Sequence, residues 1–259
     1  MKILILGCGW IGEALANRLM SEGHEVYATT TNSEKYQRLQ AAGIFAIKAN
    51  FDEPIDQSDF PSHIDFVLNS LPAVKRLDWS VLTARFEAAR ALLKQLVYRK
   101  HIFLSSVGVY PDRDGDFTEE TILDARDNKL LAAEVCMQGL PHTIVYRLGG
   151  LFGGQRIFAK YFQDKVCTTG AQCTNFIHQT DVLNLIQLGF LNQLSGSCYN
   201  LVTPESSSKK EVILASAAKY GFRPPVAFDD QECFQKHVSS HKIRQVLDYT
   251  FVYPSPLDF

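Results

Sequence analysis

The sequence predicts an α/β fold built on a doubly wound parallel sheet, and three observations support this. Short apolar, β-branched segments recur along the first 150 residues. Stretches with the apolar spacing of amphipathic helices separate them. The apolar segments are nearly continuous, as in strands that are covered on both faces. Repeated strand–helix–strand units of this kind favour an open parallel sheet, here with a small C-terminal lobe.

The elements can be placed approximately along the chain. Seven segments have the composition of strands, at residues 2–7, 25–30, 45–50, 66–71, 101–106, 143–148 and 198–202. Two apolar stripes indicate helices, one formed by Ile11, Ala14, Leu15 and Leu19 and the other by Phe86, Ala89, Leu93, Leu96 and Val97. Further helical patterns cover residues 125–137 and about 209–220.

These elements suggest a division into a large domain and a lobe. Residues 1–150 are expected to form the large domain, and residues 175–202 are expected to return to it. After Gly150 the sequence becomes rich in glycine and threonine, which is typical of loops. Residues 151–174 and 203–259 are therefore expected to form a small substrate lobe over the carboxyl ends of the strands, where such sheets bind ligands.

Composition excludes several classes of function. The 259 residues carry a formal net charge of −2, so no broad basic surface is expected to bind nucleic acid. No apolar segment is long enough to span a membrane. The six cysteines form no CxxC motif and no Cys/His cluster, so no metal site is expected. Free cysteines of this kind suggest a reduced, cytoplasmic protein.

The most informative motif follows the first predicted strand. Gly7, Gly9 and Gly12 fit the pattern GxGxxG, with Trp10 and Ile11 between the last two glycines. The first glycine permits a tight turn, the second lets the backbone approach a pyrophosphate, and the third lets the helix pack closely. The N-terminus of the helix then attracts the phosphates. We expect a nicotinamide dinucleotide to bind here; the alternative is a turn that serves packing alone.

The sequence about twenty residues later bears on the choice of dinucleotide. NAD-binding proteins usually place an Asp or Glu there to bind the ribose 2′-hydroxyl. This chain has Thr30 and Thr31, and its first carboxylate is Glu34. Hydroxyl side chains do not repel a 2′-phosphate, and Lys35 is close by. We therefore expect NADP or NAD, with NADP favoured, although the arginine typical of NADP sites is missing from this segment.

Five further motifs carry a resemblance to a known family. They are LSSVGVYPD (104–112), KLLAAE (129–134), YRLGGLFGG (146–154), NFIHQTDV (175–182) and SSHKIRQVL (239–247). With the glycine motif, they resemble the short-chain dehydrogenase/reductase superfamily, in its extended NAD-dependent epimerase/dehydratase branch and most closely the short bacterial YeeZ-like members. The resemblance covers nearly the whole chain. It implies a Rossmann sheet and an oxidoreductase or epimerase chemistry.

The resemblance also implies catalytic residues. A serine after the fifth strand binds the reacting oxygen, and Ser106 matches it. A tyrosine that transfers the proton stands four residues before a lysine that lowers the tyrosine pKa. Lys129 matches the lysine, but position 125 is Ala, and no Tyr occurs between Tyr110 and Tyr146. The alternatives are that Ser106 only caps a turn and that Lys129 is a solvated helix lysine.

Other residues are implied near the cofactor or can be set aside. The resemblance places Leu71, Pro72, Ser105, Leu148 and Gly149 beside the dinucleotide. A YxxxK sequence at 161–165 follows the sixth strand instead of the fifth, so it is not expected to be the catalytic pair.

Two functions of different classes remain open. One is an NAD(P)-dependent oxidoreductase or epimerase/dehydratase-like enzyme, which acts on a small polar substrate such as a sugar nucleotide. The other is a non-catalytic dinucleotide-binding regulator or redox sensor, which the missing tyrosine favours. The resemblance also implies a homodimer formed through two long helices.

Overall fold

A computed structural model describes residues 1–74, 76–194, 198–231 and 233–259. It confirms the predicted fold class, because seven strands form a parallel sheet in the order β11-β7-β5-β4-β1-β2-β3 with flanking helices. The chain divides into two compact units. The first contains Met1–Ser105, Leu123–Tyr146 and Ile186–Cys198, and the second contains Ser106–Ile122, Arg147–Leu185 and Tyr199–Phe259.

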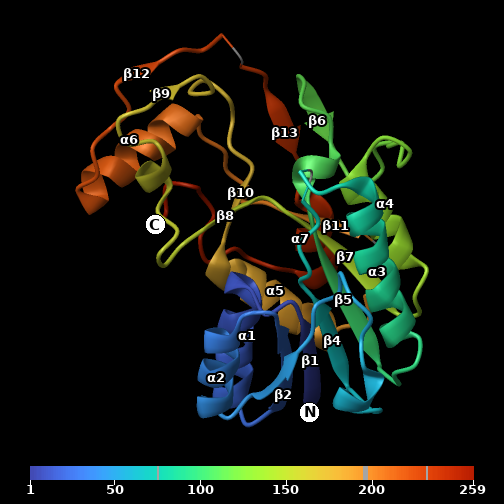
Figure 1. The fold of residues 1–259 in the computed structure, drawn as a ribbon. Helices are drawn as coiled ribbons and strands as arrows, with labels where there is room; N and C mark the ends of the chain where they lie inside the picture. Colours follow the sequence, from blue (N-terminus) through green and yellow to red (C-terminus); the bar gives the residue numbers. More distant parts are fainter. Residues whose placement is uncertain (75, 195–197, 232) are drawn as a thin grey trace. The chain divides into compact units, whose positions relative to one another are not determined.

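The first unit contains most of the large sheet (Figure 1). Its strands are β1 (Lys2–Leu6), β2 (Glu25–Thr30), β3 (Phe45–Lys48), β4 (Phe66–Asn69), nearly all of β5 (Lys100–Ser106) and the first part of β7 (Thr143–Leu148). Its helices are α1 (Trp10–Ser21), α2 (Ser33–Ala41), η1 (Gln57–Asp59), α3 (Trp79–Leu93), α4 (Lys129–Gln138) and the second part of α5 (Gln179–Leu191).

Helices cover both faces of this part of the sheet. In Figure 1, α3 and α4 lie together on one side of the strands, while α1 and α2 lie on the other. The side chains of β1 alternate accordingly: Leu4 and Leu6 join a buried cluster that includes Phe86 of α3 and Met137 of α4. This burial on both faces explains why Ile3–Leu6 of β1 are all apolar and buried.

The second unit is built from short elements. Besides the end of β7 and the first part of α5, they are η2 (Val107–Val109), β6 (Gly115–Phe117), β8 (Gly150–Phe152), η3 (Phe158–Tyr161), β9 (Val166–Cys167), β10 (Phe176–His178), most of β11 (Cys198–Leu201), α6 (Lys209–Tyr220), β12 (Ala227–Phe228), β13 (Lys236–Val238) and α7 (His241–Leu247). Of these, β8 pairs with β10, β9 with β12, and β6 with β13. A small aromatic core joins Phe152, Phe176 and Val212.

The predicted elements correspond well to the observed ones, with two corrections. The predicted helix at 125–137 begins four residues later, because Asn128 is its N-cap and accepts a hydrogen bond from the Leu131 N–H. Helix α3 ends at Leu93, so Leu96 and Val97 lie beyond it. The sequence boundaries of the large domain and the lobe stay a prediction. Within the part of the chain described here, no helix is long and apolar enough to cross a membrane.

Candidate functional site

The turn after β1 requires glycine at its first position. Gly7 has a φ of 75°, in the region that side chains disfavour. A Cβ atom there would lie 2.9 Å from the carbonyl oxygen of Ser70, which follows β4. The Gly7 N–H donates to Thr29 Oγ1 at 2.8 Å, so the turn is also tied to β2. Both the conformation and the close backbone contact therefore exclude larger residues.

The other two glycines have different surroundings. A Cβ on Gly12 would lie 3.0 Å from Ile5 Cγ2, so this glycine lets α1 pack closely on β1. Among the described residues, a Cβ on Gly9 would meet the Gly7 carbonyl oxygen alone, at 3.9 Å, which leaves room above the turn. Gly9 is also the residue that caps α1, where the helix dipole favours an anion. These surroundings agree with the separate roles expected for the three glycines.

The turn opens onto a cavity of about 750 Å³. Its size lies within the range typical of small-molecule sites. The cavity lies at the carboxyl ends of β1 to β4 and is lined by Gly7, Cys8, Gly9, Thr29, Thr30, Thr31, Asn32, Glu34, Lys35, Arg38, Ala49, Asn50, Phe51, Asp52, Ser70, Leu71, Pro72 and Arg85. Six residues that the sequence analysis placed beside the dinucleotide line this one cavity: Gly7, Gly9, Thr30, Thr31, Leu71 and Pro72. Trp10, Ile11 and Gly12 belong to α1 and are not among the lining residues.

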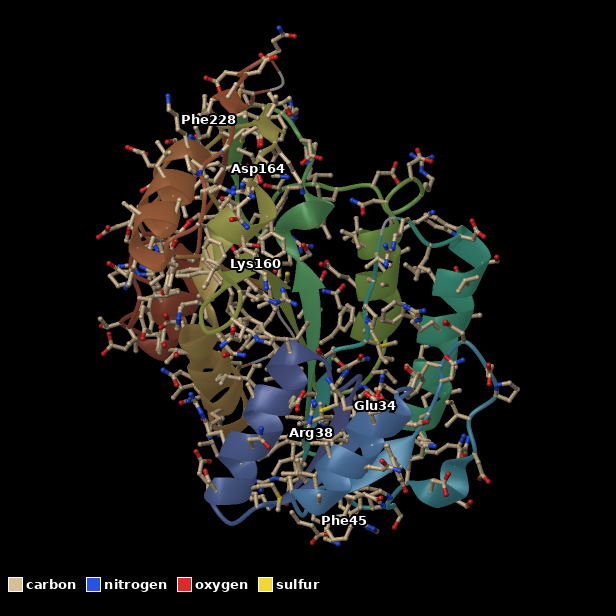
Figure 2. All side chains as sticks on the ribbon, turned by 60° about the vertical axis from the view of Figure 1, so that its left-hand side comes forward. Glu34, Arg38, Phe45, Lys160, Asp164 and Phe228 are labelled. Atoms are coloured by element: carbon tan, nitrogen blue, oxygen red, sulfur yellow. The ribbon has the colours of Figure 1, made fainter. Side chains whose placement is uncertain are left out.

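Two cations of α2 line the cavity. Lys35 Nζ donates to the carbonyl oxygen of Cys8 at 2.9 Å and lies 3.1 Å from Glu13 Oε2. Arg38 lies 2.5 Å from the other oxygen of the same carboxylate. Figure 2 shows Arg38 and Glu34 on α2, and both residues line the cavity. The sequence interpretation missed Arg38, because it comes eight residues after the end of β2.

The carboxylate between these cations, that of Glu13, has a lowered pKa. Burial alone would raise the pKa of Glu13, but the hydrogen bonds from Lys35 and Arg38 outweigh it and lower the pKa. Glu13 is therefore charged at neutral pH. In contrast, burial raises the pKa of the Cys8 thiol to about 11, so this lining residue is a neutral thiol rather than a nucleophile.

A second charged pair borders the cavity. Arg85 of α3 forms a two-pronged contact with Asp52, at 2.8 and 2.7 Å, and donates to the Pro72 carbonyl oxygen at 2.7 Å. These hydrogen bonds lower the pKa of Asp52. Because one guanidinium joins the segments after β3 and β4, it holds that side of the cavity in shape.

The predicted catalytic residues have clear partners. The hydroxyl of Ser106 accepts a hydrogen bond from the Gly108 N–H at 3.0 Å and so caps η2. Lys129 Nζ donates to the Leu77 carbonyl oxygen at 2.5 Å. Lys129 is the first residue of α4, and Ala125 lies in the segment before this helix. Positions 125 and 129 therefore do not share a helix face. The catalytic roles of Ser106 and Lys129 stay predictions.

The neighbouring Ser105 has a partner that the sequence interpretation missed. Its hydroxyl donates to Glu134 Oε1 of α4 at 2.5 Å, and the Glu134 side chain is fully buried. In the second unit, Leu148 is buried at the end of β7. A Cβ on Gly149 would lie 2.4 Å from the Asn175 carbonyl oxygen, so backbone packing alone requires a glycine there. Whether Ser105, Leu148 and Gly149 bind cofactor stays a prediction.

The YxxxK sequence of the second unit is not a tyrosine–lysine pair. Lys165 Nζ donates to the main-chain oxygen of Tyr161, and the Tyr161 side chain is exposed. The ammonium group of Lys165 therefore contacts the backbone of Tyr161 and not its phenol.

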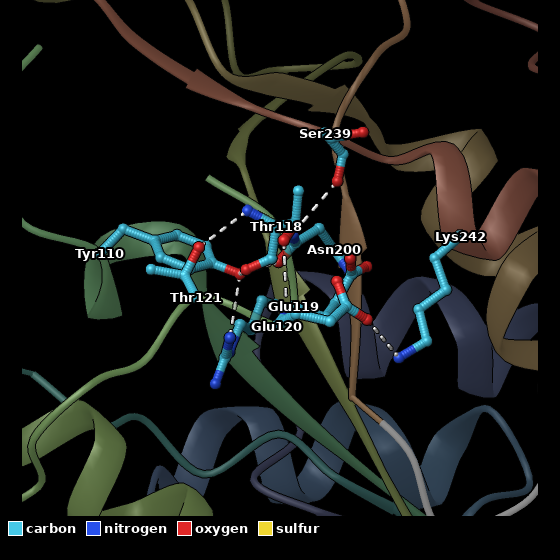
Figure 3. A network of polar contacts seen from close by, with 9 residues as sticks. Tyr110, Thr118, Glu119, Glu120, Thr121, Asn200, Ser239 and Lys242 are labelled. Atoms are coloured by element: carbon cyan, nitrogen blue, oxygen red, sulfur yellow. Dashed lines mark hydrogen bonds and ion pairs between the residues drawn. The ribbon is translucent and has the colours of Figure 1, made fainter. Parts of the chain in front are cut away.

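The second unit contains a buried polar network instead (Figure 3). The Tyr110 hydroxyl accepts from Arg147 at 2.9 Å and shares its proton between Asn200 Oδ1 and the Thr118 carbonyl oxygen. The Asn200 N–H in turn donates to Glu119 Oε1 at 2.6 Å. Within the described ranges, no group of three or more His, Cys, Asp or Glu side chains could hold a metal ion.

Comparisons with known proteins agree with this architecture. The family model of the NAD dependent epimerase/dehydratase family matches residues 3–130. Protein YeeZ of Escherichia coli (strain K12) is 27% identical over 268 residues, which cover 99% of this chain and 97% of YeeZ.

Two solved structures have the same fold. A functionally unknown conserved protein from Silicibacter pomeroyi DSS is 23% identical, with a TM-score of 0.78 over 99% of this chain and 95% of that one. UDP-glucuronic acid 4-epimerase from Bacillus cereus, in complex with NAD, is 19% identical, with a TM-score of 0.77 over 100% and 95%. Residues 3–130 of this chain therefore form a domain similar to those of the NAD dependent epimerase/dehydratase family.

Proposed function

We propose that this protein is an NAD(P)-dependent oxidoreductase or epimerase/dehydratase-like enzyme that acts on a small polar substrate. The observation that carries the proposal is the Gly7–Gly12 turn, which opens onto a cavity large enough for part of a dinucleotide. The turn leaves space above Gly9 and presents the N-terminus of α1, so it fits a pyrophosphate. A sugar nucleotide is the substrate class suggested by the name of the Bacillus cereus relative.

We propose NADP rather than NAD as the preferred cofactor. No carboxylate follows β2 directly, because Thr30, Thr31 and Asn32 occupy its end. The two cations Lys35 and Arg38 line the same cavity and could pair with a 2′-phosphate. Glu34 is the residue that supports the alternative, since it could bind the 2′-hydroxyl of NAD.

The bound nicotinamide would accept or donate hydride at its C4 atom. Ser106 is proposed to hold the substrate oxygen through its hydroxyl, and Lys129 to bind the nicotinamide ribose. The chain has Ala125 in place of the family's tyrosine, so the proton donor is unassigned. This gap favours the second candidate, a non-catalytic dinucleotide-binding regulator or redox sensor.

Two further proposals concern the oligomeric state and the cellular location of the protein. A groove of about 390 Å³ between α3 and α4 is bordered by the exposed side chains of Trp79 and Val135. We propose it as the contact surface of a homodimer, with gel filtration and light scattering as the test. The six cysteines are all free thiols, which supports a cytoplasmic location.

Fluorescence titration with NADH and NADPH tests the main proposal. We expect both to bind, and we expect NADPH to bind more tightly. The double variant Lys35→Ala/Arg38→Ala should weaken NADPH binding about a hundredfold and NADH binding much less, since two charge-assisted contacts are lost. If neither dinucleotide binds, the proposal is wrong.

Turnover separates the enzyme from the regulator. The protein should be assayed for NAD(P)H oxidation or sugar epimerisation with panels of sugar nucleotides and small carbonyl compounds. Tight cofactor binding without any turnover supports the regulator. Turnover that is unchanged in Ser106→Ala contradicts the role proposed for Ser106.

A further inference from the structure

The carboxylate of Glu13 occupies the place where the two cavity cations converge. One of its oxygens lies 2.5 Å from the Arg38 guanidinium and the other 3.1 Å from Lys35 Nζ. Glu13 comes from α1, whereas both cations come from α2. Because each oxygen faces a different cation, a single carboxylate bridges Lys35 and Arg38.

This bridge can be opened by a ligand. About a quarter of the Glu13 and Lys35 side chains is exposed, and the Arg38 side chain is 63% exposed. Ion pairs with this exposure contribute little to folding stability, so exchanging one partner costs little. A phosphate dianion carries more charge than a carboxylate and offers more oxygens to the same donors.

Glu13 itself lies outside the set of cavity-lining residues, whereas Lys35 and Arg38 belong to it. A ligand in the cavity therefore meets the cations directly and competes with Glu13 for them. A ligand without a charge at this position leaves the bridge intact. The carboxylate thus acts only on ligands that need the two cations.

We propose that Glu13 sets the cofactor selectivity of this cavity by competing with the 2′-phosphate of NADPH for Lys35 and Arg38. The inference rests on the proposed NADP preference and adds to it a residue that opposes that preference. Its lowered pKa keeps Glu13 charged, and hence competing, at neutral pH. With the native glutamate, the affinities for NADH and NADPH would be similar enough for the protein to use either cofactor.

The variant Glu13→Gln tests this inference. It keeps the shape of the side chain and removes its charge. We expect NADPH to bind about fivefold more tightly, the effect of releasing two partly exposed ion pairs, with NADH unchanged within about twofold. Calorimetry with 2′,5′-ADP and 5′-ADP should show the same difference without the nicotinamide. The gain should shrink in high salt.

A matched control separates this effect from a change in net charge. Glu25 forms an ion pair with Lys2 at 3.3 Å at the other end of β2, outside the cavity. Glu25→Gln removes the same charge and should leave both affinities unchanged. Glu13→Asp retains the charge on a shorter side chain and should not tighten NADPH binding.

The outcomes separate the two proposals. If neither dinucleotide binds the unaltered protein, the proposed function fails. If the Lys35→Ala/Arg38→Ala variant loses NADPH binding but Glu13→Gln binds it no more tightly, the inference alone fails. If Glu13→Gln weakens NADPH binding, the carboxylate orders the two cations for the phosphate, and the competition is wrong.

Discussion

The cavity beside Gly7 in the first unit and the polar network of the second unit both contain charged and polar side chains, but the partners of these side chains differ. Around the cavity, Lys35 and Arg38 pair with Glu13 through partly exposed ion pairs. In the network, Tyr110 and Arg147 are buried, and their hydrogen bonds are made within the protein. A partly exposed ion pair can exchange one partner for a ligand at little cost, whereas a buried hydrogen-bond network stabilises the fold.

Two glutamates illustrate the same contrast. Hydrogen bonds from two cations outweigh burial at Glu13 and lower its pKa. At Glu119 burial dominates and raises the pKa, despite the hydrogen bonds from backbone N–H groups and the nearby Lys242. The charged form is therefore favoured at Glu13 and disfavoured at Glu119.

The largest effect is expected at the glycine turn. Gly7→Ala places a Cβ atom about 3 Å from the backbone of Ser70 and Leu71 at a positive φ. We expect NADPH affinity to fall about a thousandfold and the free energy of unfolding to fall by about 2–3 kcal/mol. Fluorescence titration and urea denaturation measure the two quantities.

Gly23 provides a matched control for this substitution. It also has a positive φ, of 80°, but a Cβ atom there would meet none of the described residues within 4 Å. Gly23→Ala should cost about 1 kcal/mol through backbone strain and leave cofactor affinity unchanged. Equal loss of binding in both variants would show that Gly7 matters for folding alone.

An intermediate effect is expected in the polar network. Tyr110→Phe removes the hydroxyl that accepts a hydrogen bond from Arg147 and donates one to Asn200 in the buried network. We expect the free energy of unfolding to fall by about 2–4 kcal/mol, with cofactor affinity unchanged. The exposed Tyr161 serves as the control, because Tyr161→Phe should have no effect. A large loss of turnover with unchanged stability would instead make Tyr110 a candidate proton donor.

The smallest effect is expected from the two glutamates, with opposite signs. The raised pKa of Glu119 means that its stabilising contribution is present at low pH and is lost as pH rises through the folded-state pKa. The lowered pKa of Glu13 means that its contribution is present at neutral pH and is lost as pH falls through the folded-state pKa.

Replacing each glutamate by glutamine should reveal these signs. At pH 7, Glu119→Gln should stabilise the protein and Glu13→Gln should destabilise it, each by less than about 1 kcal/mol because both groups are partly exposed. Urea denaturation between pH 4 and 8 measures the difference. If both variants changed the free energy of unfolding in the same direction at neutral pH, the contrast between the two regions would be wrong.

The sequence predicted what depends on local patterns and missed what depends on contacts between distant segments. The strands 25–30 and 143–148 were predicted with their observed bounds, because apolar β-branched runs are local signals. The glycine turn was predicted for the same reason. The meeting of Glu13 with Arg38 was not, since it depends on how α1 and α2 pack on the sheet.

Helix starts and single carboxylates were harder to predict. The helical pattern of the sequence extends over residues 125–128, and only the hydrogen bond to the Asn128 side chain marks the start of the helix. The carboxylate of Asp181 lies in the first turn of α5 and accepts hydrogen bonds from the Tyr249 hydroxyl and from the Val252 N–H. These partners are about seventy residues away, so no local pattern reveals them.

The division of the chain has a consequence for any attempt to isolate the first unit. The chain changes unit five times, after Ser105, Ile122, Tyr146, Leu185 and Cys198. A fragment that ended at Tyr146 would lack the second part of α5, whose carbonyl oxygens at Gly189 and Phe190 receive the ammonium of Lys100 at 2.9 and 3.2 Å. No single truncation therefore yields this unit whole, and grafting it elsewhere would require three spliced segments.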